Sequence, residues 1–180
     1  MLKIVQVPNK VLITPTQKVV NFDSKLKKLI ADMEETLIAQ VDPQGVGLAA
    51  TQVGVNKAIF IMKPKPTGPT TVCINPEILQ IEEPSTSSTK KSKKKQSGAL
   101  EGCLSIPRIW SPLRRPKKVL LKYQTEAGET KEEWFVGFKA IIVQHEVDHL
   151  NGILFTKRAL EQNSSLYEER EGELLKIKSI

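Results

Sequence analysis

Apolar side chains recur at helical spacing in two parts of the chain. Between residues 25 and 40 they fall on one face, which predicts an amphipathic helix with Asp23 or Ser24 as its N-cap. A second apolar run starts near Gly137 and continues, past several polar residues, to Leu150. Because its apolar positions occur on several faces, this segment predicts a helix buried on most sides.

Strands are predicted where β-branched and aromatic residues cluster between turn residues. These segments are residues 57–62, 71–75 and 78–81, and a hairpin of 119–123 and 132–136. Residues 153–155 predict one more short strand, and the heavily charged residues 158–180 predict a helical tail. A single domain accommodates all of these elements, because 180 residues are enough to bury one core.

The composition is that of a soluble globular protein. Hydrophobic residues make up 39% and charged residues 26%, and no apolar run approaches the roughly 20 residues that a membrane span needs. The first residues lack the apolar core and cleavage site of a signal peptide. Two cysteines, Cys73 and Cys103, are too few for a disulfide framework. We therefore expect a protein of the reducing cytoplasm.

One segment carries most of the net positive charge. Residues 85–98 are rich in Ser, Thr and Lys, and five lysines lie within residues 90–95. The formal net charge is +7, and setting these five lysines aside leaves 22 basic against 20 acidic residues, or +2. So polar and repetitive a segment predicts a mobile insertion. Its lysines suit contact with RNA phosphates, and a merely solvated loop fits the composition equally well.

Metal-binding chemistry is indicated inside the second predicted helix. His145 and His149, the only two histidines of the chain, would lie about 40° apart around the helix and about 6 Å apart along it. Both can therefore reach one ion, and Glu146 lies where a base can touch a ligand of that ion. A pair of core histidines is the weaker alternative. The pattern is typical of a metallohydrolase.

A hydrolytic metal site needs three protein ligands and one open position. A third histidine after Gly152 is excluded, because Phe155 occupies its place. Two sources remain open from spacing alone. One is a glutamate from later in the chain, Glu168 or Glu169, and the other is the upstream soft donor Cys103.

Three stretches, taken together, resemble the peptide deformylase family. They are residues 45–52 (Gly-Val-Gly-Leu-Ala-Ala-Thr-Gln), 101–105 (Glu-Gly-Cys-Leu-Ser) and 144–152 (Gln-His-Glu-Val-Asp-His-Leu-Asn-Gly). The first is weak alone, since a glycine-rich turn explains it, but the three in this order are specific. The resemblance covers about residues 1–160. It implies one α+β catalytic domain of mixed, mostly antiparallel sheets packed around a central metal-binding helix, with residues 161–180 as a charged helical tail.

The resemblance also implies a reaction. A deformylase hydrolyses the N-formyl group from the initiator methionine of new polypeptides and releases formate. The implied ligands of one divalent ion are Cys103, His145 and His149. The family typically uses Fe(II) in the cell, and Zn, Ni or Co can occupy the same ligands, so the resemblance implies Fe(II) while the sequence alone does not choose among these metals. Glu146 would be the base, and the side chain of Gln52 and the backbone N–H of Leu104 would donate to the developing oxyanion.

The resemblance further implies a set of substrate-binding residues: Gly45, Val46, Gly47, Glu101, Phe138, Ile141 and Ile142. Glu101 would orient Gln52 or the substrate, and Asp148 would pair with Arg115. One departure concerns Trp110, because many bacterial relatives carry an arginine there. The peptide preference beyond formylmethionine is therefore open.

Two other functions compete with deformylation. A zinc peptidase would take Glu168 or Glu169 as its third ligand, and a basic ribosome- or RNA-binding module would carry a structural zinc. For a deformylase, the expected partners are N-formylmethionyl nascent peptides, and the ribosome through residues 90–95 or the tail. We expect no membrane and no specific DNA among its partners.

Overall fold

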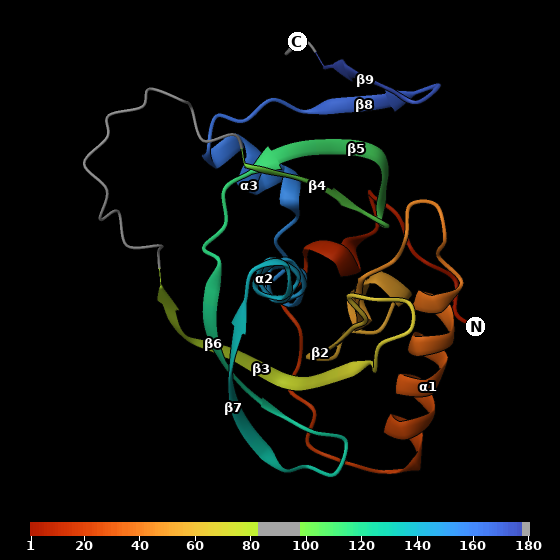
Figure 1. Cartoon of the computed structure of the whole chain (residues 1–180). Coiled ribbons are helices and arrows are strands. Elements are labelled where there is room, and N and C mark those ends of the chain that lie inside the picture. Colours follow the sequence, from red (N-terminus) through yellow and green to blue (C-terminus); the bar gives the residue numbers. More distant parts are fainter. Residues whose placement is uncertain (83–97, 178–180) are drawn as a thin grey trace.

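A computed structural model describes residues 1–82 and 98–177, in which two sheets enclose helix α2 (Phe138–Leu150), seen end-on in Figure 1. The five-stranded sheet has the order β1 (Gly47–Ala49), β2 (Ile59–Met62), β3 (Thr71–Glu82), β6 (Lys118–Gln124) and β7 (Thr130–Val136). The four-stranded sheet has the order β4 (Ala99–Cys103), β5 (Ile106–Leu113), β8 (Tyr167–Arg170) and β9 (Glu173–Lys176). The α+β prediction is confirmed, and the named strands pair antiparallel throughout.

The remaining helical elements are α1 (Ser24–Ile38), α3 (Phe155–Glu161) and the 3-10 turns η1 (Lys10–Ile13) and η2 (Ala50–Val53). Within the described residues, no helix is both long and apolar enough to cross a membrane. The predicted mobile insertion at residues 85–98 lies, apart from Gly98, outside the described part of the chain.

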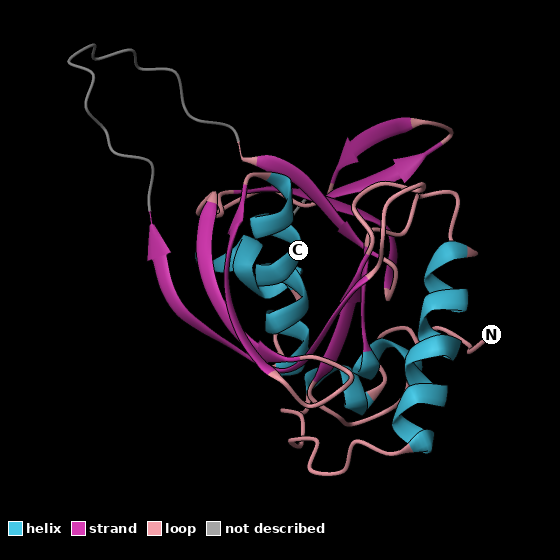
Figure 2. Cartoon of the chain, turned by 60° about the horizontal axis from the view of Figure 1, so that its bottom comes forward, coloured by secondary structure: helices cyan, strands magenta, loops and turns pink. Residues whose placement is uncertain are grey.

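Helix α1 forms where its apolar spacing predicts. The Asp23 side chain caps it by accepting a hydrogen bond from the Leu26 N–H at 2.9 Å. Its buried face, which includes Ile30 and Met33, packs on the outer side of the five-stranded sheet. Figure 2 shows this helix at the outside of the molecule, while α2 is enclosed between strands.

Strand β2 separates two cores. Its consecutive side chains alternate between the faces of the sheet, as strand geometry requires. Ile59 and Ile61 join the cluster that packs on α1, whereas Phe60 and Met62 join the cluster that packs on α2. The five-stranded sheet is therefore covered by a helix on each face here.

Helix α2 is buried on most of its circumference, as its sequence predicts. Ala140, Ile142, Val143 and Leu150 pack against residues of β2, β6 and β7. The polar residues of its second half are also buried, and they face β4 and the loop after β5. A buried polar side of this kind must find hydrogen-bond partners inside the protein.

The two strands predicted at 71–75 and 78–81 are one strand, β3, which pairs first with β2 and then with β6. The pairing register shifts between Ile74 and Glu77. Asn75 has a positive φ of 50° at this point, and Pro76 has no N–H to donate. The irregularity interrupts the ladder without ending the strand, which explains the break in the sequence pattern.

The prediction of a helical tail over 161–180 is wrong. Helix α3 ends at Glu161, and the β8–β9 hairpin follows and pairs with β5. The turn residues Glu171 and Gly172 have φ of 51° and 82°, the left-handed backbone of a tight hairpin turn. The edge of β5 decides the outcome, because it supplies backbone partners that a pattern of scattered charges does not reveal. The hairpin thus belongs to the same domain.

The short strand predicted at 153–155 is also wrong. Phe155 begins helix α3 and is only 1% exposed, packed with Ala159 and Leu113. Strands β4 and β5 were not predicted as elements, although Cys103 and Trp110 lie on them.

Candidate metal centre

Three side chains with metal-binding atoms meet where the end of β4 approaches α2. Cys103 is the last residue of β4, and His145 and His149 lie one turn apart on α2. The Cys103 Sγ lies 3.1 Å from His149 Nε2, which lies 3.2 Å from His145 Nε2. All three ligand atoms are within 4.8 Å of one another. The structure therefore brings the three predicted ligands together.

The distances between these atoms fit a tetrahedral ion. Bonds of about 2.0 Å to nitrogen and about 2.3 Å to sulfur place two nitrogens about 3.3 Å apart and a nitrogen and a sulfur about 3.5 Å apart. The observed spacings of 3.2 and 3.1 Å lie within half an ångström of these values. One thiolate and two imidazoles suit several divalent ions of the first transition row. The residues present therefore fit a divalent metal.

Cys103 is prepared to bind as a thiolate, which is the form that metals require. Burial by itself would raise the pKa of its thiol, but the neighbouring His149 and His145 outweigh burial and lower the pKa to about 5. Cys73 is the opposite case. It lies in the middle of β3, where burial raises the pKa of its thiol well above the usual value. Core packing accounts for Cys73, as the sequence predicts.

A buried network of charges supports His145 from behind. Its Nδ1 lies 2.7 Å from Glu101 Oε1, and Arg115 donates to the two Glu101 oxygens at 2.8 and 2.7 Å. Burial opposes ionisation of Glu101, but the hydrogen bonds from Arg115 and His145 prevail and lower its pKa to about 2. An ionised Glu101 can only accept, so His145 Nδ1 donates and Nε2 is the ring nitrogen that faces the other ligands.

The same guanidinium extends the network to the next turn of α2. Arg115 Nη1 donates to Asp148 Oδ2 at 2.8 Å, which confirms the predicted pair. Glu101 was predicted to orient Gln52 or the substrate. The Gln52 alternative is wrong, because the Glu101 carboxylate binds Arg115 and His145, and the substrate alternative stays a prediction. Arg158 of α3 adds bonds of 3.1 and 2.6 Å to Asp148 and was missed. It is the first residue of the segment 158–180, which the sequence predicted only as a charged helical tail.

Glu146 lies beside the ligands, buried in the wall of a pocket. Within the described part of the chain its Oε2 has no hydrogen-bond partner. Burial raises the pKa of Glu146 to about 7. Gly47 makes room for it, because a Cβ at Gly47 would overlap Glu146 Oε1 and lie 2.9 Å from both Glu146 Cδ and Ile142 Cγ2. A carboxyl that titrates near neutrality is suited to exchanging protons.

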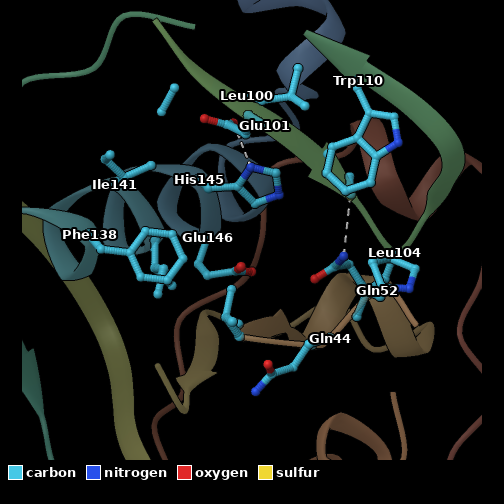
Figure 3. A pocket seen from close by; sticks show the side chains of 18 residues that line it. Gln44, Gln52, Leu100, Glu101, Leu104, Trp110, Phe138, Ile141, His145 and Glu146 are labelled. Carbon is cyan, nitrogen blue, oxygen red and sulfur yellow. Dashed lines mark hydrogen bonds and ion pairs between the residues drawn. The ribbon is translucent and has the colours of Figure 1, made fainter. Parts of the chain in front are cut away.

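Gln52 reaches the centre from the turn η2. Its Oε1 accepts a hydrogen bond from the Ala49 N–H at 2.8 Å, and its Nε2 lies 3.5 Å from Cys103 Sγ (Figure 3). The backbone bond fixes which way the amide points. Its N–H donors therefore face the ligands and the pocket.

A pocket of about 220 Å³ opens beside the three ligands (Figure 3). Every predicted site residue lines it except His149, which is 1% exposed and lies against Cys103. Trp110 is also in the wall. Sequence reasoning missed five more lining residues, which lie in or next to the glycine-rich and Glu-Gly-Cys motifs: Pro43, Gln44, Ala99, Leu100 and Gly102. Their position next to those motifs was the available signal.

The model of the polypeptide deformylase family matches residues 1–165. This chain belongs to the peptide deformylase family. A peptide deformylase 1 of Bacillus cereus is 36% identical over 94% of this chain and 97% of its own length. The peptide deformylase of Helicobacter pylori is 37% identical over 98% of this chain and 96% of its own length. The crystal structure of the Thermotoga maritima peptide deformylase superposes with a TM-score of 0.75 at 40% identity, covering 88% of this chain and 97% of that one.

Membership of this family defines the reaction. The chain is a metal-dependent hydrolase that removes the N-formyl group from nascent peptides. The competing zinc peptidase is contradicted by the positions of its two glutamates. Glu169 accepts a hydrogen bond from the Trp110 indole at 2.7 Å, and Glu168 pairs with Arg170 at 2.6 Å. Neither belongs to the ligand cluster formed by the described residues. A binding module with a structural zinc is excluded by the same family assignment.

Proposed function

We propose that Glu146, Gln52 and Leu104 carry out the deformylation step in the pocket beside the ligand cluster. A divalent ion held by the three ligands supplies Lewis acidity and lowers the pKa of water toward neutrality. One observation carries the proposal. Glu146 is 3% exposed, lines the pocket next to the ligands, and keeps one oxygen unpaired among the described residues.

Glu146 moves the proton that the reaction requires. As the water oxygen adds to the formyl carbon, Glu146 accepts the proton that the water loses. As the C–N bond breaks, Glu146 donates this proton to the departing amine nitrogen. Formate and a peptide with an unblocked methionine amine result. A pKa of about 7 serves both transfers, because neither direction is then strongly uphill.

Negative charge develops on the formyl oxygen and needs donors. Gln52 supplies one, because the bond from Ala49 to its Oε1 leaves the Nε2 donors aimed at the site. The family resemblance assigns the second donor to the backbone N–H of Leu104, which lines the same pocket. Each such donor is worth about 3 kcal/mol of transition-state stabilisation.

The peptide binds as an added strand. Strand β1 is the end strand of its sheet, so the backbone of Gly47, and of Gly45 just before it, can pair with an extended peptide. The methionine side chain enters the apolar part of the pocket, lined by Val46, Phe138, Ile141 and Ile142. Such a pocket selects by size and dispersion, so we expect moderate selectivity. Glu101 contributes from the pocket wall by fixing His145.

We propose Fe(II) as the native ion, with Zn, Ni or Co able to replace it, because the thiolate–imidazole donor set suits all four. A reducing cytoplasm fits an enzyme whose two cysteines are both unpaired thiols. We further propose weak contact with ribosomal RNA through residues 90–95, supported by their five lysines. Deleting residues 86–96 would weaken ribosome binding at low salt, and unchanged affinity would reject this contact.

The proposed roles are tested with formyl-Met-Ala-Ser and anaerobically purified protein. Formate release and bound metal are measured on the same sample. Glu146→Gln is expected to abolish turnover while the metal stays bound. Glu77→Gln is the matched control, since Glu77 is exposed on β3 and should change neither quantity. Turnover by Glu146→Gln within tenfold of the original protein would refute the role of Glu146.

A further inference from the structure

Trp110 lies on β5, an inner strand of the four-stranded sheet, and its side chain contacts a glycine of β4 and a glutamate of β8. On β4 its directly paired residue is Gly102, and on β8 it is Tyr167. Glu169 lies two residues beyond Tyr167, so its side chain projects from the same face of the sheet as Trp110.

The indole is held at both ends. A Cβ at Gly102 would lie 2.7 Å from Trp110 Cε3 and Cζ3, so the six-membered ring rests directly on the backbone of β4. At the other end, Nε1 donates to Glu169 Oε2 at 2.7 Å. These two contacts hold the indole from opposite ends. In this orientation the indole lines the substrate pocket.

The pocket has two apolar sides. Figure 3 shows Phe138 and Ile141 on one side, Trp110 and Leu104 on the other, and Glu146 between them. In an extended peptide, successive side chains point in opposite directions. A methionine that enters the side lined by Phe138 therefore directs the next side chain toward Trp110.

We propose that Glu169 of the C-terminal hairpin is a positioning residue that fixes Trp110 as a wall of the pocket, and that this wall selects an apolar side chain on the residue after formylmethionine. The inference rests on the proposed binding mode of the peptide. It assigns the β8–β9 hairpin a part in specificity, although the hairpin contributes no metal ligand and no lining residue of its own.

The first test measures kcat and KM for formyl-Met-Leu-Ser and formyl-Met-Ala-Ser. We expect a preference for leucine of about fivefold in kcat/KM, because its larger apolar side chain buries more surface against the indole than alanine does. Glu169→Ala should remove this preference through KM, with kcat unchanged. Glu169→Gln keeps an acceptor and should restore it. Glu168→Ala is the matched control on the same strand and should behave as the original protein.

Trp110→Phe tests whether the Trp110–Glu169 hydrogen bond positions the ring or only stabilises the fold, because this variant keeps an aromatic ring and removes the Nε1 donor. It should lose as much leucine preference as Glu169→Ala, and the double variant should lose no more than either single one. Additive losses, or a preference that survives Glu169→Ala, would overturn the proposal. A change confined to thermal stability would overturn it as well.

A second readout does not depend on turnover. In a Trp134→Phe background, Trp110 is the one tryptophan of the chain, and its fluorescence reports binding of the product peptides Met-Leu-Ser and Met-Ala-Ser. We expect about fivefold tighter binding of the leucine peptide, lost in Glu169→Ala. Equal affinities would overturn the inference. Absence of formate release with this difference intact would instead refute the proposed function alone.

Discussion

Gly47 offers the sharpest test of how the pocket is built. A methyl group at this position would overlap the Glu146 carboxylate and approach Ile142 Cγ2 at 2.9 Å. Glu146 Cδ would lie 2.9 Å from the new carbon, whereas carbon atoms in contact prefer about 3.5 to 4.0 Å, so the carboxylate of Gly47→Ala must retreat by about 0.6 to 1.1 Å. Strand β1 cannot move away instead, because it is paired with β2 and its side-chain positions are fully buried.

A displacement of this size costs much more activity than stability. Misplacing a reacting group by about 1 Å reduces the rate by about 100-fold, whereas overpacking destabilises a protein by about 1–3 kcal/mol. We therefore expect kcat for formyl-Met-Ala-Ser to fall by about 100-fold in Gly47→Ala. Bound metal should not change, since the ligands on α2 and β4 are not displaced. Formate release, metal analysis and urea unfolding measure the three quantities.

Gly68→Ala is the control for the glycine substitution itself. A Cβ at Gly68 would lie 3.4 Å from its nearest neighbour, the Lys65 carbonyl oxygen, and Gly68 is not a pocket residue. It should leave kcat unchanged. If Gly47→Ala kept kcat within threefold of the original protein at equal metal content, the close packing of Gly47 against Glu146 would be wrong.

Three further predictions follow from the ligands and the charges behind them. Cys103→Ala should purify with less than a tenth of the bound metal, and full metal content would show that Cys103 is not a ligand. Arg115→Met leaves two buried carboxylates poorly compensated and should lower the free energy of unfolding by about 3–5 kcal/mol at pH 7. Arg158→Met removes a side chain that is 35% exposed and should lower it by only about 1 kcal/mol. Equal losses for the two variants in urea titrations would contradict this prediction. In metal-free protein, the pKa of Glu101 falls from 4.5 to about 2 on folding, so its contribution of about 3 kcal/mol is fully present above pH 4.5 and is lost as the pH falls through about 2. In Arg115→Met, the free energy of unfolding should lose most of this dependence on pH. If it changed between pH 5 and pH 3 as much as in the original protein, the prediction would be refuted.

Local sequence determined the helices α1 and α2. The spacing of apolar residues predicts α1, because a helix brings every third and fourth residue to one face. Helix α2 is predicted from an apolar run whose positions occur on several faces, as in a helix buried on most sides. Spacing also places His145 and His149 on one turn of α2 with Glu146 beside them. These relations hold within a few residues and depend only on helix geometry.

The third ligand could not be chosen by spacing alone. Cys103 is 42 residues before His145. Glu168 and Glu169 come after His145, and by spacing alone either was as plausible a third ligand as Cys103. Resemblance favoured Cys103, and the structure agrees because β4 ends beside α2. Arg158 and its bond to Asp148 stayed hidden for the same reason, since nothing local connects them.

The C-terminal segment shows where local pattern fails. Its charges are spaced as on an exposed helix, yet it forms β8 and β9, because β5 presents an edge with unpaired backbone groups. The helices and the histidine pair were therefore determined by neighbouring residues. The thiolate ligand, the guanidinium groups that bind Glu101 and Asp148, and the strand carrying Glu169 were decided by tertiary contacts, because each depends on a partner in another element of the fold.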